Sequence, residues 1–181
     1  MSKIDLRSIP TQSDFVAWWK ALPRTGDGHA PALADCLDGA HPGFAPWIVI
    51  VDVVNDFRLP IRLFGTRLTE FFGERTATDY LDHMPPSLRK PIALSHKAMC
   101  AMPCGRLTEA YGVTGSGRDI VLDMVSLPLS SPGNISHVIK FTRIVEQLDV
   151  QEGLSRVNRI FMQTWLDIGA GVPETPCDAL G

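Results

Sequence analysis

Large apolar side chains recur along residues 11–22 at intervals of three or four positions, which is the period of one helix face. They are Phe15, Trp18, Trp19 and Leu22. Thr11 or Ser13 can cap this helix, and Pro23 ends it. Four prolines then fall between residues 23 and 46, so we expect an irregular segment with one short helix near residues 32–37.

Two strands are predicted next. Residues 47–54 form an apolar run that is rich in β-branched side chains. Residues 57–63 alternate apolar residues with arginine or proline, as expected for a half-buried strand. Asn55 and Asp56 favour a turn between the two strands, which makes a hairpin. Pro60 lacks a backbone donor and so predicts a free edge or a bulge at that position.

The hydrophobic period becomes helical after the hairpin. Leu68, Phe71 and Phe72 fit the apolar face of one short helix, and Gly73 can end it. A further helical turn is expected within residues 76–84. A longer helix is predicted to begin between residues 87 and 91 and to end near residue 102, with Pro91 in its first turn.

Three more strands are predicted at residues 107–113, 120–129 and 135–145, joined by tight turns that contain glycine. Together with the first hairpin they predict an α+β fold with one five-stranded antiparallel sheet. The helices within residues 66–102 should cover one face of this sheet. A ligand pocket can lie between those helices and the sheet.

A last helix is predicted from residue 149 to residue 168. Asp149 and Glu152 resemble a capping box, and Gly169 can end the helix. Its apolar residues recur every three or four positions, as in a coiled-coil or packing seam: Val150, Leu154, Val157, Phe161, Trp165 and Ile168. Residues 170–181 hold two prolines and are expected to be a disordered tail.

The chain therefore divides into an amino-terminal helix with an irregular cap (1–46), a core (47–146), a carboxyl-terminal helix (147–169) and the tail (170–181). Its 181 residues suit one domain.

The net charge is −3 and the basic residues are scattered, which argues against a nucleic-acid partner. No apolar run approaches the roughly 20 residues that span a bilayer. Without a signal sequence, we expect a cytoplasmic protein with no membrane contact and with free thiols at its four cysteines.

Several short motifs follow one another at a characteristic spacing. The block from Phe57 to Thr66 reads as a strand that ends in a Gly-Thr pair. Further motifs within residues 12–145 are Trp18-Trp19, Pro23-Arg24, Pro31, Phe72-Gly73, Thr76 and Tyr80-Leu81. In this order they resemble the PAS domain superfamily, and more narrowly the short PAS proteins common in alphaproteobacteria. Ala77 departs from the pattern, because the family usually has glycine there.

This resemblance implies a sensory or regulatory PAS-like module rather than an enzyme. A small metabolite would bind between the sheet and the helices, and the signal would pass to a separate partner protein. The flanking helices would form a homodimer. The residues expected to line the pocket are Arg62, Phe71, Tyr80, His96, Met99, Tyr111, Met124 and His137. His96 shares a helix face with Met99 and should point inward. For Arg62, a salt bridge within the domain is favoured over an anionic ligand.

The sequence also leaves several other functions open. A histidine on the long helix of PAS relatives can ligate haem iron, which makes His96 a candidate. His96, Cys100 and Cys104 stand four residues apart, an unusual spacing for zinc, and Pro103 breaks the helix between the cysteines. The flavin-reactive Asn-Cys-Arg-Phe motif, the nucleophile elbow and the phosphate loop do not occur. A ligand-free dimerisation or interaction scaffold and a small enzyme complete the alternatives, and the sequence identifies no cofactor.

Overall fold

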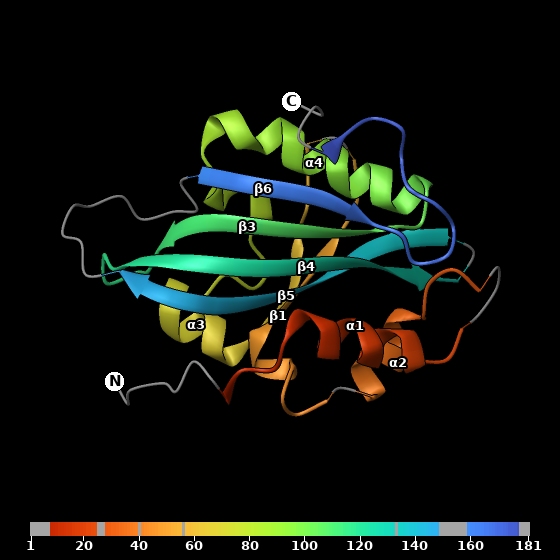
Figure 1. Cartoon of the computed structure of the whole chain (residues 1–181), viewed down its shortest axis with the longest axis horizontal. Helices are drawn as coiled ribbons and strands as arrows, with labels where there is room; N and C mark the ends of the chain where they lie inside the picture. The colour runs from red at the N-terminus through yellow and green to blue at the C-terminus, as the bar shows by residue number, and fades with distance from the viewer. Residues whose placement is uncertain are drawn as a thin grey trace.

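Six strands form one antiparallel sheet in the part of the chain that the structure describes, in the order β2-β1-β5-β4-β3-β6. This computed structural model describes residues 8–24, 28–39, 41–55, 57–132, 134–148 and 159–177. The α-helices and the short 3-10 helices (η) are α1 (Gln12–Ala21), α2 (Leu33–Asp38), η2 (Ala45–Trp47), α3 (Thr66–Phe72), η3 (Tyr80–His83) and α4 (Pro86–Ala101). The strands are β1 (Ile48–Asp52), β2 (Ile61–Phe64), β3 (Gly105–Val113), β4 (Asp119–Ser131), β5 (Asn134–Leu148) and β6 (Arg159–Leu166) (Figure 1).

The predicted hairpin at the start of the sheet is present, but its strands are shorter than predicted: β1 ends at Asp52 rather than at residue 54, and β2 begins at Ile61 rather than at residue 57. β1 pairs antiparallel with β2 on one side and with β5 on the other. The register shifts between Ile50 and Val51, and β2 is the edge strand. Pro60, directly before β2, therefore lies where a missing backbone donor is tolerated.

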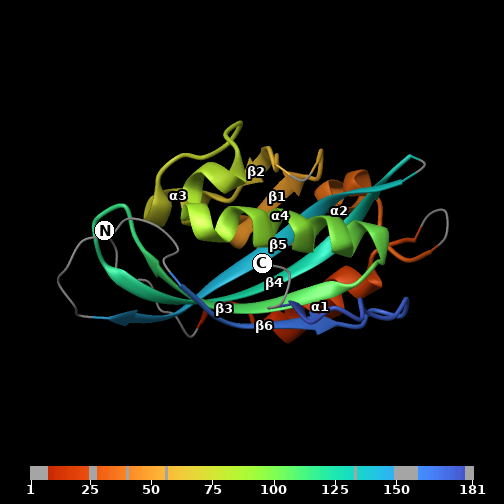
Figure 2. The same ribbon diagram turned by 90° about the horizontal axis from the view of Figure 1, so that it is seen from above.

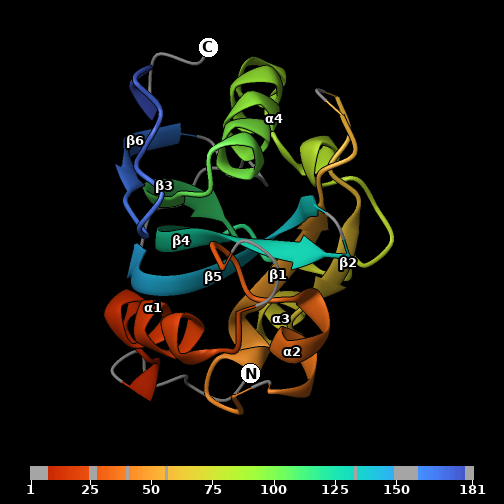
Figure 3. The same ribbon diagram turned by 90° about the vertical axis from the view of Figure 1, so that its right-hand side faces the viewer.

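Helices cover both faces of the sheet. Successive residues of a strand point to opposite faces, so Lys140 and Phe141 of β5 mark the two sides. The ring of Phe141 stacks on Phe15 of α1 with centroids 5.0 Å apart, whereas Lys140 contacts Tyr80 of η3. We call the side of α1 the outer face and the side of α3, η3 and α4 the inner face. Figures 2 and 3 show α4 and α1 on opposite sides of the sheet.

The first helix forms where the sequence predicts it. Thr11 caps α1 in a capping box with Asp14, which satisfies backbone donors at the helix start. The buried indole of Trp19 donates a hydrogen bond of 3.2 Å to the carbonyl oxygen of Pro128 in β4. The guanidinium of Arg24 lies over the Trp19 ring, 4.4 Å from its centroid. α1 is thus fixed to the outer face through one long aromatic side chain.

The long helix α4 begins earlier than predicted. Pro86 is its first residue, and Pro91 lies inside the helix rather than in the first turn. Proline is favourable at the first position because the N–H there has no partner within the helix. At Pro91 the ring costs one backbone hydrogen bond. The residues that α4 buries toward the inner face are Ile92, Ala93, Ser95, His96 and Met99.

The predicted carboxyl-terminal helix is wrong in the described residues. Residues 159–166 form β6, which pairs antiparallel with β3 and raises the strand count from five to six (Figure 1). The first part of the predicted helix, 149–158, lies outside the described residues. Strand β3 would otherwise present an unpaired row of backbone groups, and pairing with it overrides the helical spacing of the apolar residues.

The segment after β6 also differs from the predicted disordered tail. The indole N–H of Trp165 donates to the carbonyl oxygen of Thr175 at 2.9 Å. Cys177 is buried. Thr175 and Cys177 therefore contact β6, and Cys177 also lies near Leu88 and Pro91 of α4, while 178–181 lie outside the described residues.

Candidate ligand-binding site

A row of polar side chains crosses the inner face at the centre of the sheet. The register places Lys140 of β5 opposite Ser126 of β4, and Ser126 opposite Arg106 of β3. These three residues are only 3%, 0% and 2% exposed. Opposing Cβ atoms in neighbouring strands are about 4.5–5.5 Å apart, so two cations flank one hydroxyl. Thr108, two residues beyond Arg106 on the same face, is also buried.

Side chains from η3 and α4 form the roof over this row. The ammonium of Lys140 donates a hydrogen bond to the hydroxyl of Tyr80 and lies 3.9 Å from the centroid of its ring. The guanidinium of Arg106 donates to the hydroxyl of Ser95. That hydroxyl in turn donates to the carbonyl oxygen of Ile92 at 2.8 Å. Arg106 also hydrogen-bonds with the thiol of Cys177. Neither of the two basic side chains is therefore anchored by a carboxylate in the described residues.

His96 of α4 completes the roof and is fully buried. Its Nδ1 lies 2.7 Å from the carbonyl oxygen of Ile92. A carbonyl only accepts, so Nδ1 carries the proton and Nε2 of the neutral ring is an acceptor. Burial lowers the pKa of His96 well below its ordinary value, and the charges of Arg106 and Lys140 lower it further. The imidazole therefore adds no positive charge to the site at neutral pH.

The charge of the cluster is uncompensated within the described residues. No Asp or Glu there forms an ion pair with Arg106 or Lys140. Burial lowers the pKa of Lys140 well below its usual range, and the neighbouring charge of Arg106 acts in the same direction. Burial also lowers the pKa of Arg106. Burial without a counter-anion therefore disfavours the charged form of Lys140, and an anion placed between Lys140 and Arg106 would stabilise the charged forms of both.

The same cluster contains four buried polar atoms without a hydrogen-bond partner in the described residues. They are Nε2 of His96, Nε of Arg106, Oγ1 of Thr108 and Oγ of Ser126. Buried polar groups in folded proteins almost always have partners, either in the protein or in bound molecules. Their concentration on one patch of the inner face is typical of a site that binds a polar group.

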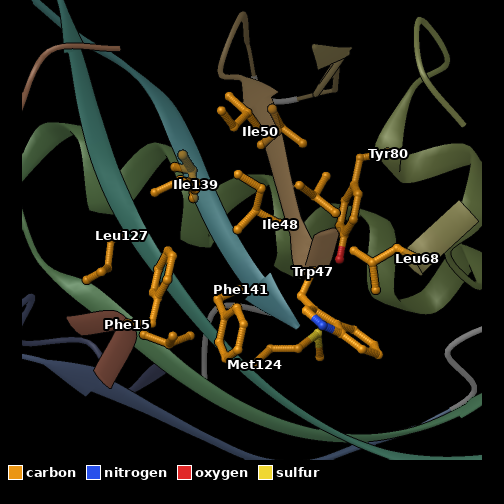
Figure 4. Packing of buried hydrophobic residues seen from close by; sticks show 14 of the residues in the cluster. Phe15, Trp47, Ile48, Ile50, Leu68, Tyr80, Met124, Leu127, Ile139 and Phe141 are labelled. Carbon is orange, nitrogen blue, oxygen red and sulfur yellow. The ribbon is translucent and has the colours of Figure 1, made fainter. Parts of the chain in front are cut away.

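A small apolar cavity lies next to the polar row. Its volume is about 30 Å³, and its lining includes Leu68 and Phe72 of α3, Met124 of β4 and Tyr80. Figure 4 shows Tyr80 beside Leu68. Tyr80 therefore belongs both to the cavity and to the polar cluster. Sites for drug-sized ligands usually measure about 300–1,000 Å³, so this interior admits only a small group unless the helices shift.

Most of the residues predicted to line a pocket are on the inner side of the molecule. His96 and Met99 are fully buried, which confirms that this face of α4 points inward. Tyr80 and Met124 line the cavity. Phe71 is buried beside Trp47, with ring centroids 6.2 Å apart.

Three of the predicted pocket residues lie elsewhere. Tyr111 is 42% exposed, because odd-numbered residues of β3 point to the outer face beyond the cover of α1. His137 shares the outer-face parity of Phe141 and pairs with Asp52 at 2.8 Å. Arg62 forms a two-bond ion pair with the same carboxylate, at 2.8 and 2.9 Å. The salt bridge favoured for Arg62 is thus present. Although burial raises the pKa of Asp52, Arg62 and His137 outweigh it and lower that pKa overall.

Sequence reasoning missed Arg106, Ser126 and Lys140. A signal was available for Lys140, since it interrupts an apolar strand at the position between Ile139 and Phe141. The apolar neighbours occupy one face, so Lys140 must point to the other, which the predicted helices cover. Arg106 fell one residue before the predicted strand and was not assigned to a face.

The chain matches no protein-family model and no curated protein. Within the residues that the structure describes, no helix is long and apolar enough to cross a membrane. The same residues contain no group of three or more His, Cys, Asp or Glu side chains that could hold a metal ion.

Acid should destabilise the fold through His96. Its pKa is lowered in the folded state, so below about pH 6.5 the unfolded chain binds a proton that the folded chain does not. This contribution to stability is complete above that pH and is lost as the pH falls toward the folded-state pKa. The slope for one proton is at most about 1.4 kcal/mol per pH unit. Urea unfolding measured at several pH values should show a smaller slope for His96→Gln.

The matched control is His41→Gln, because His41 is exposed on the surface. The slope of this variant gives the effect of the same histidine-to-glutamine change at an exposed position, with which the slope of His96→Gln is compared. An equal slope in the wild type and in His96→Gln would show that the buried imidazole does not resist protonation.

Proposed function

We propose that this chain is a sensory or regulatory module of the PAS kind that binds a small metabolite between the inner face of the sheet and α4. The observation that carries the proposal is the buried cluster of Arg106, Ser126 and Lys140, which has no counter-anion and several unpartnered polar atoms among the residues that the structure describes. A protein whose core served only for stability would gain from apolar residues at these positions.

The arrangement of the elements supports this proposal. Two strands precede a helical segment and four follow it, and all six lie in one antiparallel sheet with that segment on one face. The PAS pattern accounts for β1 to β5, and β6 is an addition at the edge of β3. Ala77 supplies a second observation. Its φ is +63°, and it is the only residue other than glycine with a positive φ in the described part of the chain. This conformation favours glycine, the residue that the PAS pattern has at that position.

The site suggests how binding could be transmitted. Ser95 and His96 belong to α4, whereas Arg106 and Lys140 belong to the sheet. A ligand held by both would tie α4 to the sheet, and it would shift the equilibrium between two states if its affinity for them differed. We propose that a partner protein responds to this change, and that no chemical step is catalysed.

Mass spectrometry of the purified protein under native and denaturing conditions tests the proposal. The native wild-type protein should carry a metabolite that is released on denaturation. The double variant Arg106→Met/Lys140→Met should lose it, because both cations are replaced by apolar chains of similar length. The control Arg62→Met should retain it, because Arg62 is paired with Asp52 away from the site. Recovery of the bare polypeptide from the wild type would contradict the proposal, and a visible absorption band would instead indicate haem or flavin.

A ligand-free dimerisation scaffold is the second candidate. It is favoured by the cavity of only about 30 Å³ and by apolar residues exposed at one end of the sheet. Phe161 and Met162 of β6 are 44% and 42% exposed, and the ring of Phe161 lies 5.0 Å from that of Tyr111. β6 is also the last strand of the sheet. An edge strand with exposed apolar side chains favours pairing with a second copy of the chain.

A homodimer formed through β6 predicts a specific result in light scattering. The wild type should have twice the monomer mass at micromolar concentration, and Phe161→Asp should reduce it to the monomer by placing a charge in the interface. Phe57→Asp is the control. Phe57 is 77% exposed, and it lies just before β2, the strand at the opposite edge of the sheet from β6. A wild-type monomer would rule out this interface.

A further inference from the structure

We propose that the ligand is an organic carboxylate, with its carboxylate group between Arg106 and Lys140 and a short apolar body toward the cavity beside Met124 and Leu68. This inference rests on the proposed binding function and names the ligand class for the same site. It follows from the charge, the donors and the apolar space around the polar row.

The two basic side chains of the site favour a negatively charged ligand. Arg106 and Lys140 lie on either side of Ser126, and both are at least nine-tenths buried. Their hydrogen-bond partners among the described residues are the hydroxyls of Ser95 and Tyr80 and the thiol of Cys177, none of which is a carboxylate. An anion between the two cations would replace the hydration that both lose on burial. A neutral ligand would leave this cost in place.

The donors match the size of a carboxylate. Nε of Arg106 is unpartnered, and the hydroxyls of Ser126 and Thr108 have no partner among the described residues. The ammonium of Lys140 has three N–H groups, of which Tyr80 accepts one. A carboxylate has about four lone-pair positions on two oxygens, and it forms short, strong bonds with Arg and Lys.

The surroundings favour an organic acid over a free inorganic anion. Beyond Tyr80 the cavity is lined mainly by apolar side chains, among them Leu68, Phe72 and Met124, and also by Arg75 and Thr142. The apolar side chains offer an apolar body a favourable place outside water. Phosphate or chloride would gain nothing from them. The cavity volume of about 30 Å³ restricts the body to a short one.

Thermal unfolding with defined probes tests the ligand class. The protein is first unfolded in urea, dialysed and refolded, so that any metabolite bound during expression is removed. The probes are acetate, butyrate and hexanoate, with butyramide as the uncharged match of butyrate and inorganic phosphate as the purely ionic probe, all at equal ionic strength. We expect a rise in Tm with butyrate that exceeds the rise with acetate, and no rise with butyramide or phosphate.

Two single variants locate the site. Arg106→Met and Lys140→Met should each weaken the response to butyrate at least tenfold in half-saturating concentration, whereas Arg62→Met should leave it unchanged. If a variant does not fold, the comparison of butyrate with butyramide on the wild type still decides the inference. Equal effects of butyrate and butyramide would overturn it, and a phosphate response equal to that of butyrate would identify an inorganic-anion site instead.

Failure of this inference is distinguishable from failure of the proposed function. A released metabolite that is not a carboxylate would overturn the inference and leave the binding function standing. A wild type that carries no metabolite and responds to no probe would overturn both.

Discussion

Replacing Phe141 by alanine should lower the free energy of unfolding by about 3–5 kcal/mol, the usual cost of removing a buried phenyl ring. Phe141 is 0% exposed at the centre of the outer face. Its ring stacks on Phe15 with centroids 5.0 Å apart (Figure 4). It also meets the ring of Phe44 edge-on, with centroids 5.6 Å apart. The substitution leaves a cavity where α1 and the segment before β1 meet the sheet. Urea denaturation followed by tryptophan fluorescence measures the loss.

Phe57→Ala provides the matched control for Phe141→Ala. The same ring is removed, but Phe57 is 77% exposed. Its loss should change the free energy of unfolding by less than about 0.5 kcal/mol, as is usual for surface positions. Similar effects of the two substitutions would mean that α1 does not pack against β5 in the way described.

Replacing Gly65 by alanine should destabilise the fold by about 3 kcal/mol or more, because the added methyl group has no space. A Cβ at this position would lie 2.4 Å from the carbonyl oxygen of Pro46 and 2.6 Å from its carbonyl carbon. Both are backbone atoms, so they cannot rotate away. The φ of Gly65 is −64°, a value that alanine adopts readily, so the loss measures close packing rather than backbone strain.

Gly115→Ala is the control for Gly65→Ala. The nearest atom to a Cβ there is the carbonyl oxygen of Phe71 at 3.5 Å, which is an ordinary contact. Urea midpoints should separate the two variants clearly. If Gly65→Ala unfolds at the same urea concentration as Gly115→Ala, then η2 and the start of α3 do not pack together as closely as described.

Local patterns were sufficient to predict most of the fold. The alternation in residues 57–63 and the turn signals near residues 115 and 132 depend on neighbouring residues alone, and the corresponding hairpins are present. The helical spacing of Leu68 and Phe71 likewise predicted α3. These signals are reliable because backbone geometry and side-chain direction set them within a few residues.

Features that depend on distant partners were not predictable in this way. Phe161 and Trp165 are four residues apart, which fits a helix face, yet the free edge of β3 recruits this segment as a strand. The role of Gly65 was similar: the sequence placed it at the end of a strand, and the structure shows a close approach to Pro46, which lies 19 positions earlier in the chain. No local pattern encodes either contact.

The candidate site combines both kinds of information. His96 was placed on the inward face of α4 from spacing alone, and that prediction is confirmed. The row of Lys140, Ser126 and Arg106 depends on the register of three strands, and a shift by one residue would turn a side chain to the opposite face. Only the assembled sheet brings the two cations to opposite sides of one hydroxyl.

The crystal structure of the protein as purified tests the central claim most directly. We predict electron density for a molecule other than the polypeptide or water within hydrogen-bonding distance of Nε of Arg106 and the ammonium of Lys140. Asp178 follows Cys177, whose thiol hydrogen-bonds with Arg106, and Asp178 lies outside the described residues. A carboxylate of the chain itself, such as Asp178, or ordered water alone in that position would contradict the claim that this cluster is a ligand-binding site.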